Sequence, residues 1–419
     1  MKSRLFLTLC FVTLFSTSFA QYNDPNIAKP SSGYGADGTH SVNVISFQNP
    51  NFTSKNIEIY HPADIQTPVP TIFYSHAYGG NISDNISGML NFVAMKGYAI
   101  VFVPYQTLGV TVEERYINLL SGFRMAARNY PSVIDTTRVG FMGHSFGGGA
   151  SFGLAHQYFT ENNWGSNGRF IYALAQWYSY RLDDNDLSTF PSDTKVLVEV
   201  FDDDTINDHR MAIDVFNRIN ITADEKDYII LKSDTINGYI YSAEHNVPST
   251  SVAFDAFDYY AYYRFIDALA DYTFHESTSG KLTALGNGSP EQVTMPGGLK
   301  SLVQTDSPTT SYPESKYTFP CSNSTENPRS YKCVETTEVN NIAGEENDPI
   351  IYPNPVKDIF RLKLKINATE RTIDIYSVSG EKLMAVQSLQ SDNFVNVSAL
   401  PSGIYLVKAG EIYTRLLKL

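Results

Sequence analysis

The chain of 419 residues is short of positive charge and of long apolar runs. It has 31 Lys and Arg against 44 Asp and Glu, which gives a formal net charge of −13. Nucleic acid and anionic membranes are poor partners for such a surface, because like charges repel. No segment beyond the N-terminus offers the roughly 18 uninterrupted apolar residues that a transmembrane helix needs. We therefore expect a soluble mature protein with no nucleic-acid partner and no membrane span.

The first twenty residues have the features of a signal peptide. Two basic residues, Lys2 and Arg4, precede a short apolar run, and small residues ending at Ala20 precede the expected cleavage site. Removal of residues 1–20 takes away two basic and no acidic side chains, so the mature charge is 29 minus 44, or −15. The protein is therefore expected to be exported.

Cysteine is scarce, with three residues in the whole chain. Cys10 lies in the expected signal peptide, which leaves Cys321 and Cys333 in the mature protein. An even pair in an exported protein favours a disulfide that closes a small loop. Two free thiols are the alternative.

Strand-like and helix-like segments alternate from about residue 41 to residue 273. Apolar runs bounded by turn residues are typical of strands that are covered on both faces. The expected strands are 41–47, 56–62, 71–75, 98–105, 138–143, 170–177, 195–201 and 227–232. The expected helices are 86–96, 112–129, 147–159, 208–219 and about 254–273. The pattern predicts an α/β fold, with a mostly parallel central sheet flanked by helices.

The composition changes after about residue 276. Gly, Pro, Ser and Thr dominate there, and we expect an irregular extension that lies against the core and is held by the disulfide. A partly flexible linker is the alternative. The first domain is thus predicted to span residues 21–340, followed by an acidic linker at 341–350. Short alternating strands with Asn-Pro and Ser-Gly turns predict a small antiparallel β-sandwich at 351–419.

Three turn motifs of this sandwich carry a resemblance. Tyr352-Pro353-Asn354-Pro355, Ser379-Gly380 and the run Leu400-Pro401-Ser402-Gly403-Ile404-Tyr405 resemble the C-terminal sorting domain of the type IX secretion system. The resemblance implies a Gram-negative bacterium of the Bacteroidetes type, the type IX machinery as a partner, and an extracellular or surface-attached protein. A carbohydrate-binding or adhesive sandwich is a weaker alternative, because no aromatic platform stands out.

Ser145 lies in a motif that is typical of a serine nucleophile. The stretch 143–147, Gly-His-Ser-Phe-Gly, matches G-x-S-x-G and stands between an expected strand and an expected helix. Glycines on both sides allow the cramped turn that lifts a serine hydroxyl out of the sheet. The alternative is one polar residue in a glycine-rich loop.

A serine nucleophile needs a histidine base and an acid that orients it. In α/β-hydrolases, whose elbow the motif resembles, these residues follow in the chain order Ser, acid, His. The strand 195–201 runs into Asp202, Asp203 and Asp204, and we expect Asp204 to be the acid, with Asp203 as second choice. Another possibility for this acidic run is a solvated loop or a weak calcium site shared with Asp208. Of the eight histidines, only His245 lies in the loop after the last expected core strand, whereas His275 follows the final expected helix. The expected triad is therefore Ser145, Asp204 and His245.

Acyl transfer also needs two backbone N–H donors that face the developing oxyanion. We expect these from Phe146, the residue after the serine, and from Tyr78 in the loop 75–80. That loop resembles the S-H-G-x-G-G segment of many esterases and the S-P-G-Y-T-G segment of bacterial cutinases. Ala77 departs from both, because glycine is usual there, and an alanine at positive φ would cost about 1 kcal/mol.

The segment 142–151 is also similar to the M-G-H-S-M-G-G-G-G-S elbow of bacterial cutinases and polyester hydrolases. The likeness implies that Tyr78, Phe146 and Trp177 line an acyl-binding cleft in which an aromatic substrate ring would stack. Tyr178 and Ser179 replace the usual histidine and acid after the tryptophan, so the outer subsite is expected to differ from that of the family. For Trp177 the alternative is a core position at a strand end.

These observations predict a secreted serine ester hydrolase that acts through an acyl-enzyme without a metal or organic cofactor. The resemblance implies a cutinase-like enzyme on polyesters, including aromatic polyesters such as PET. Alternatives are a small-ester, lipid or feruloyl carboxylesterase, or a non-catalytic surface binding protein. We expect an open cleft, because no long lid insertion is evident, and a monomer.

Overall fold

The computed structural model describes residues 22–249, 253–333, 350–363, 371–377, 381–388, 392–409 and 412–419. The predicted signal peptide and nearly all of the predicted linker lie outside the described residues. The chain divides into two compact units, Met1–Val334 and Glu335–Leu419. Each unit is described by itself.

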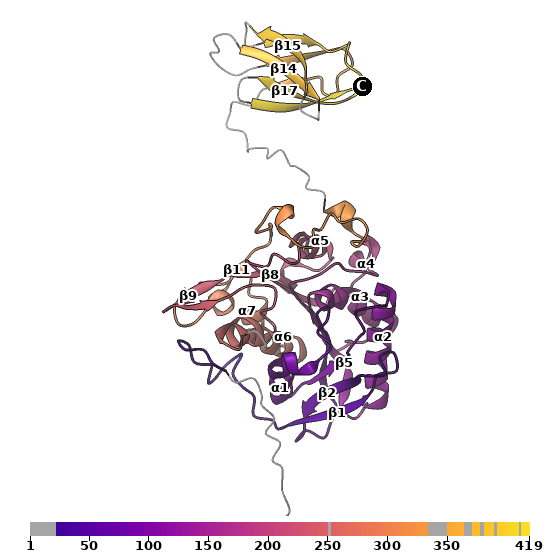
Figure 1. The fold of residues 1–419 in the computed structure, drawn as a ribbon, viewed down its shortest axis with the longest axis vertical. Helices are drawn as coiled ribbons and strands as arrows, with labels where there is room; N and C mark the ends of the chain where they lie inside the picture. The colour runs from indigo at the N-terminus through magenta and orange to yellow at the C-terminus, as the bar shows by residue number, and fades with distance from the viewer. Residues whose placement is uncertain are drawn as a thin grey trace, which may run out of the picture. The chain divides into compact units, whose positions relative to one another are not determined.

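The first unit is built on a nine-stranded mixed sheet, in the order β1-β2-β4-β3-β5-β6-β7-β8-β11 (Figure 1). The neighbouring pairs from β4 to β8 are parallel, whereas β1, β2 and β11 pair antiparallel with their neighbours. The strands are β1 (Val42–Gln48), β2 (Asn56–Pro62), β3 (Val69–Ser75), β4 (Ala99–Phe102), β5 (Ile134–His144), β6 (Arg169–Leu174), β7 (Lys195–Phe201), β8 (Lys226–Leu231) and β11 (Val303–Gln304). The expectation of a mostly parallel sheet is confirmed, because the apolar runs are the strands that are buried on both faces.

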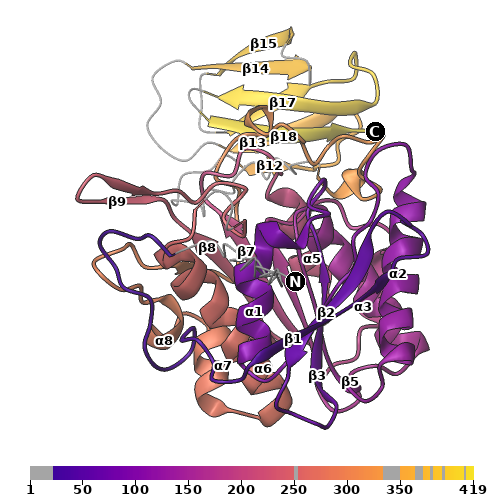
Figure 2. The same cartoon turned by 60° about the horizontal axis from the view of Figure 1, so that its bottom comes forward.

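Helices cover both faces of the sheet. Figure 2 shows α1 and α6 on one side of the strands and α2 and α3 on the other. Each side has its own apolar core, one centred on α1 and α6 and one on α2, α3 and α5. The helices are α1 (Ser87–Met95), α2 (Val112–Asn129), α3 (Phe146–Glu161), α4 (Asp184–Ser188), α5 (Arg210–Arg218) and α6 (Arg264–His275), the last preceded by a π-helical stretch, η3 (Phe257–Tyr263). Parallel strands joined by helices bring their carboxyl ends to one edge of the sheet, where the loops after β3, β5 and β7 meet.

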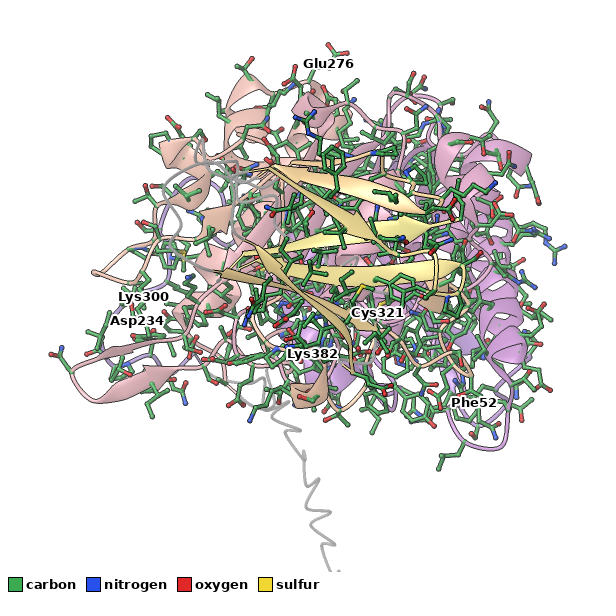
Figure 3. All side chains as sticks on the ribbon, turned by 90° about the horizontal axis from the view of Figure 1, so that it is seen from above. Phe52, Asp234, Glu276, Lys300, Cys321 and Lys382 are labelled. Carbon is green, nitrogen blue, oxygen red and sulfur yellow. A yellow bond between two sulfur atoms is a disulfide. The ribbon has the colours of Figure 1, made fainter. Side chains whose placement is uncertain are left out.

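The extension after α6 is more regular than its composition suggests. It forms α7 (Thr278–Ala284) and α8 (Pro290–Val293), capped by the hydroxyls of Ser277 and Ser289, before β11 joins the sheet edge beside β8. The strands β9 (Asp234–Ile236) and β10 (Tyr239–Tyr241) form a hairpin that contacts this extension. The backbone N–H of Lys300 in the extension donates to the side chain of Asp234 in β9 at 2.7 Å (Figure 3). Serine is a typical N-cap residue, and Pro290 favours the first turn of α8. The start of each short helix is therefore determined by its local sequence.

The second unit is all-β, as expected. One sheet has the order β12-β13-β16 and the other β15-β14-β17-β18, with every pair antiparallel. The strands are β12 (Ile350–Tyr352), β13 (Ile359–Lys363), β14 (Arg371–Ser377), β15 (Lys382–Ser388), β16 (Asp392–Asn396), β17 (Gly403–Ala409) and β18 (Ile412–Lys418). Buried side chains of both sheets, among them Phe360 and Val407, pack together in one small core.

Candidate active site

Ser145 lies at a sharp turn between β5 and α3. Its backbone has φ 56° and ψ −117°, a strained conformation for a residue with a side chain. The glycines around it permit the turn. A Cβ on Gly147 would lie 1.8 Å from the carbonyl oxygen of Ser75, and one on Gly143 would lie 2.2 Å from the oxygen of Gly147. Only glycine allows the backbones to approach so closely at these two positions.

The structure brings Ser145, His245 and Asp204 into one chain of hydrogen bonds. His245 Nε2 is 2.9 Å from Ser145 Oγ, and His245 Nδ1 is 2.7 Å from Asp204 Oδ2. A carboxylate only accepts, so Nδ1 carries the ring hydrogen and Nε2 is free to accept the serine proton. In this arrangement a histidine can act as a general base toward a serine hydroxyl.

Each of the three consecutive aspartates has a different partner. Asp204 is 1% exposed, and its Oδ1 accepts the backbone N–H groups of Ile206 at 2.7 Å and of Asn207 at 3.2 Å. Asp202 instead accepts from Ser311, and Asp203 accepts from Tyr312, at 2.7 and 2.9 Å. Of the three, Asp204 is therefore the one that contacts the histidine.

The alternative of a calcium site in this loop finds no geometric support. Asp208 forms an ion pair with Arg210 at 2.9 Å and accepts the Cys321 N–H at 3.1 Å. Among the residues that the structure describes, no three His, Cys, Asp or Glu side chains form a group that could hold a metal ion. The loop carboxylates next to Asp204 bind the extension instead.

Two other histidines support the site without joining the chain of hydrogen bonds. His144 donates from Nε2 to the carbonyl oxygen of His245 at 2.7 Å, which holds the backbone of the candidate base. His76 accepts the Tyr105 N–H at Nε2 and donates from Nδ1 to the oxygen of Ala77. Burial lowers the pKa of both His76 and His144 to about 3, so both rings stay neutral near neutral pH.

The loop after β3 lies beside the serine. Its turn is closed by a hydrogen bond of 2.9 Å from the Gly80 N–H to the oxygen of Ala77. Gly79 takes the positive φ of this loop, at 82°, and Ala77 is not at positive φ. The alanine that departs from the esterase pattern is therefore unstrained. Phe146 is the first residue of α3, where a helix leaves the backbone N–H without an intrahelical acceptor.

Ser145 and His245 open into a cavity of about 690 Å³. Its wall consists of Ala77, Tyr78, Val110, Val112, Arg115, Ser145, Phe146, Trp177, Tyr180, Ile206, Asn207, His245, Asn246, Phe319, Thr325 and Glu326. The three residues expected in an acyl cleft, Tyr78, Phe146 and Trp177, are all among them. Trp177 is partly buried rather than a full core residue, and its ring meets that of Phe319 edge-on at 4.6 Å. The cleft is thus mainly apolar and aromatic near the serine.

Arg115 of α2 is a charged wall residue that the sequence patterns did not reveal. Its guanidinium lies 5.1 Å from the centre of the Tyr78 ring and 5.5 Å from that of Phe146, within the range of cation–π attraction. It also donates to the carbonyl oxygens of Thr107 and Val110, at 2.8 and 3.2 Å. Arg115 therefore joins the loop 107–110 to the two aromatic rings of the cleft.

The extension supplies a further part of the wall, which sequence reasoning missed. Phe319 pairs in parallel with the loop after β7, and Thr325 and Glu326 also line the cavity. The predicted disulfide, Cys321–Cys333, is present and closes the loop that holds the last two. Arg329 adds a buried anchor, with Nε 2.5 Å from Asp214 Oδ2. The expected open cleft is thus bordered on one side by the extension. In the sequence, the pair Cys321 and Cys333 was the signal that this part of the extension is ordered.

Comparison with known families identifies the tail of the chain. Residues 350–415 match the secretion system C-terminal sorting domain. This sorting domain covers the all-β unit from its first strand into its last. No curated protein matches the chain. The expected type IX sorting domain is confirmed, and the family evidence leaves the first unit without an assigned activity.

The sorting domain indicates a secreted or cell-surface protein of a Bacteroidetes-type bacterium, with the secretion machinery as a partner. Within the described residues, no helix combines the length and the apolar character that crossing a membrane requires. The candidate active site therefore belongs to a secreted or cell-surface protein.

Proposed function

We propose that the first unit is an α/β-hydrolase and that the protein is a secreted serine ester hydrolase. The observation that carries the proposal is the hydrogen-bonded chain from Ser145 through His245 to Asp204, at a strained turn that opens into an apolar cleft. A serine, its base and an orienting acid in this geometry are the requirements of acyl transfer.

In the acylation step, Ser145 Oγ forms a bond to the ester carbonyl carbon while its proton passes to His245 Nε2. Asp204 orients the ring and stabilises the resulting imidazolium, at 2.7 Å from Nδ1. The ester C–O bond then breaks, and the proton moves from Nε2 to the departing alcohol. The product of this step is an acyl group on Ser145.

The negative charge that develops on the carbonyl oxygen needs donors that are already in position. We assign the backbone N–H of Phe146 and that of Tyr78 to this role, because both residues line the cleft beside the serine. The N-terminus of α3 adds a favourable dipole at the same place. Neither donor depends on a charged side chain.

Water completes the cycle along the same route. It loses a proton to His245 Nε2 as its oxygen bonds to the acyl carbon, and the C–Oγ bond then breaks. The proton returns from Nε2 to Ser145 Oγ, and the acid leaves. The residues need no metal ion or organic cofactor for either half of the reaction.

The substrate follows from the lining of the cleft. Tyr78 and Trp177 offer aromatic rings near the serine, Phe146 lines the cleft although it is 3% exposed, and the cutinase-like elbow adds to this. We therefore favour cutinase-like activity on polyesters, including aromatic polyesters such as PET. A small-ester, lipid or feruloyl carboxylesterase is the second candidate. It is favoured by Phe319, Thr325 and Glu326, because these extension residues border the cleft and limit the room for a polymer chain.

The first test compares wild type with Ser145→Ala, Asp204→Asn and, as a matched control, Asp203→Asn. We expect hydrolysis of short p-nitrophenyl esters by the wild type, none by Ser145→Ala, and a loss of roughly 10⁴-fold in kcat for Asp204→Asn. Asp203→Asn should stay near the wild-type rate, because Asp203 contacts Tyr312 and not the histidine. A wild type as inactive as Ser145→Ala would overturn the proposal.

An amorphous aromatic polyester film then separates the two substrate classes. Release of aromatic acid from the film by wild type supports the polyesterase assignment. Cleavage of short esters alone retains the hydrolase and favours the second candidate.

A further inference from the structure

Asn207, three residues beyond Asp204, contacts the candidate nucleophile itself. Its side chain is 1% exposed and lies at the wall of the cleft. The amide nitrogen Nδ2 is 3.2 Å from Ser145 Oγ and 2.9 Å from the carbonyl oxygen of Ala175. Nothing in the G-x-S-x-G motif or in the order of the triad calls for an amide at this position.

The orientation of this amide follows from its neighbours. The carbonyl oxygen of Ala175 can only accept, so the NH₂ group of Asn207 faces it, and Oδ1 does not. The hydroxyl hydrogen of Ser145 points to His245 Nε2, as the carboxylate on the other ring nitrogen requires. A lone pair of Ser145 Oγ therefore accepts the second amide hydrogen of Asn207.

These contacts leave the serine oxygen one free direction. Of its four tetrahedral positions, one holds Cβ, one the hydrogen shared with His245, and one the lone pair that accepts from Asn207. The remaining lone pair is the one that can attack a carbonyl carbon in the cleft that Ser145 lines. We propose that Asn207 is a further catalytic residue, which orients this lone pair toward the substrate; the proposal rests on the hydrolase function above.

The contact with Asn207 persists through the reaction. When Oγ bonds to the acyl carbon and its proton moves to His245, the oxygen still has a lone pair on the side of Asn207. The same donor then assists Oγ as the leaving atom when water releases the acyl group, because a hydrogen bond stabilises the charge that develops on it. Asn207 thus acts on both halves of the cycle.

The backbone holds Asn207 in place from both sides. Its own N–H donates to Asp204 Oδ1 at 3.2 Å. The residues next to it are bound to Phe319 of the extension, whose N–H donates to Ile206 at 2.9 Å and whose oxygen accepts from Asp208 at 3.2 Å. The catalytic acid and the extension therefore fix the position of the amide together.

The test measures the chemistry of Ser145 directly, with a p-nitrophenyl phosphonate as the probe. In this reaction the Oγ–P bond forms, p-nitrophenolate leaves, and the serine proton passes to His245. We expect Asn207→Ala to slow phosphonylation, and kcat for a short ester, by about tenfold or more, with little change in KM. Asn207→Asp, which keeps the volume but removes the donor, should be slowed as well.

Asn118→Ala serves as the matched control for buried asparagine. Asn118 is 3% exposed and donates to the oxygen of Pro104 at 3.3 Å. It should lower the melting temperature without slowing phosphonylation. Wild-type rates in both Asn207 variants would overturn the role of Asn207, as would equal slowing in the Asn118 variant. A wild type that releases no p-nitrophenolate would instead overturn the hydrolase function, so the two failures are distinguishable.

Discussion

Replacing the disulfide with two alanines should weaken substrate binding and leave the chemical step intact. Cys321 and Cys333 are 0% and 4% exposed and twelve positions apart. Closing a loop of this length restricts the unfolded chain by about 3 kcal/mol at 25 °C. The loop contains Thr325 and Glu326 of the cleft wall, whereas the catalytic residues lie outside it. The structure therefore separates the effect on binding from the effect on catalysis.

The assay is steady-state kinetics on a bulky aromatic ester and on a short aliphatic ester. For Cys321→Ala with Cys333→Ala, we expect KM for the bulky ester to rise by roughly three- to tenfold, because the loop opens locally more often. The kcat for the short ester should stay within about twofold of wild type. Residues 21–334, the mature part of the first unit, number 314, and their unfolding entropy is about 0.66 kcal/mol/K. If the whole unit unfolds cooperatively, a loss of about 3 kcal/mol should lower the melting temperature by about 5 °C.

Reduction of the wild type provides the matched control. Dithiothreitol should reproduce the change in KM in the wild type and have no effect on the double alanine variant. An unchanged KM for the bulky ester, with a lowered melting temperature, would refute the idea that the extension forms part of the binding cleft. An equal loss of kcat on both esters would show that the disulfide supports the triad itself.

Two further predictions concern the core and the turn at Ser145. Burial raises the pKa of Glu199 to about 8 from 4.5, so the folded state keeps a proton that the unfolded state loses, and wild-type stability should fall as pH rises across this range. Glu199→Gln keeps the acceptor for the hydrogen bond from Tyr172 but cannot ionise. The free energy of unfolding of the variant, relative to that of wild type, should therefore be higher at pH 8 than at pH 5 by the order of a few kcal/mol. An equal difference at both pH values in urea titrations would contradict this. Gly147→Ala should abolish activity or folding, because its Cβ would lie 1.8 Å from the oxygen of Ser75. Gly238→Asn is the control, because Gly238 has φ 82° and open space around it. Its free energy of unfolding should stay within about 1 kcal/mol of that of wild type. Full activity in a folded Gly147→Ala protein would refute the assigned turn geometry.

Local patterns in the sequence were sufficient for the fold class. Apolar runs separated by helix patterns predicted the parallel sheet, because strands covered on both faces exclude polar residues all along their length. The all-β tail and its sorting motifs were also evident, since tight turns require Pro, Gly and Asn at fixed places. The disulfide followed from two cysteines in an exported chain. The short helices α7 and α8 were not predicted, because helices of seven and four polar-rich residues have too few turns for an apolar period and differ from a loop only in their serine caps.

The candidate site was defined partly by the sequence and partly by the tertiary structure. The sequence by itself determined that Ser145 stands at a strand-to-helix turn and that an acidic run and His245 follow it in the chain order typical of α/β-hydrolases. Only the tertiary structure decided that Asp204 rather than Asp203 faces His245, and that Asn207, Arg115 and Phe319 lie at the cleft. The physical reason is that side-chain direction in a tight loop has no period along the chain. Contacts between residues far apart in sequence, such as Asn207 with Phe319, are set by packing and not by any local pattern.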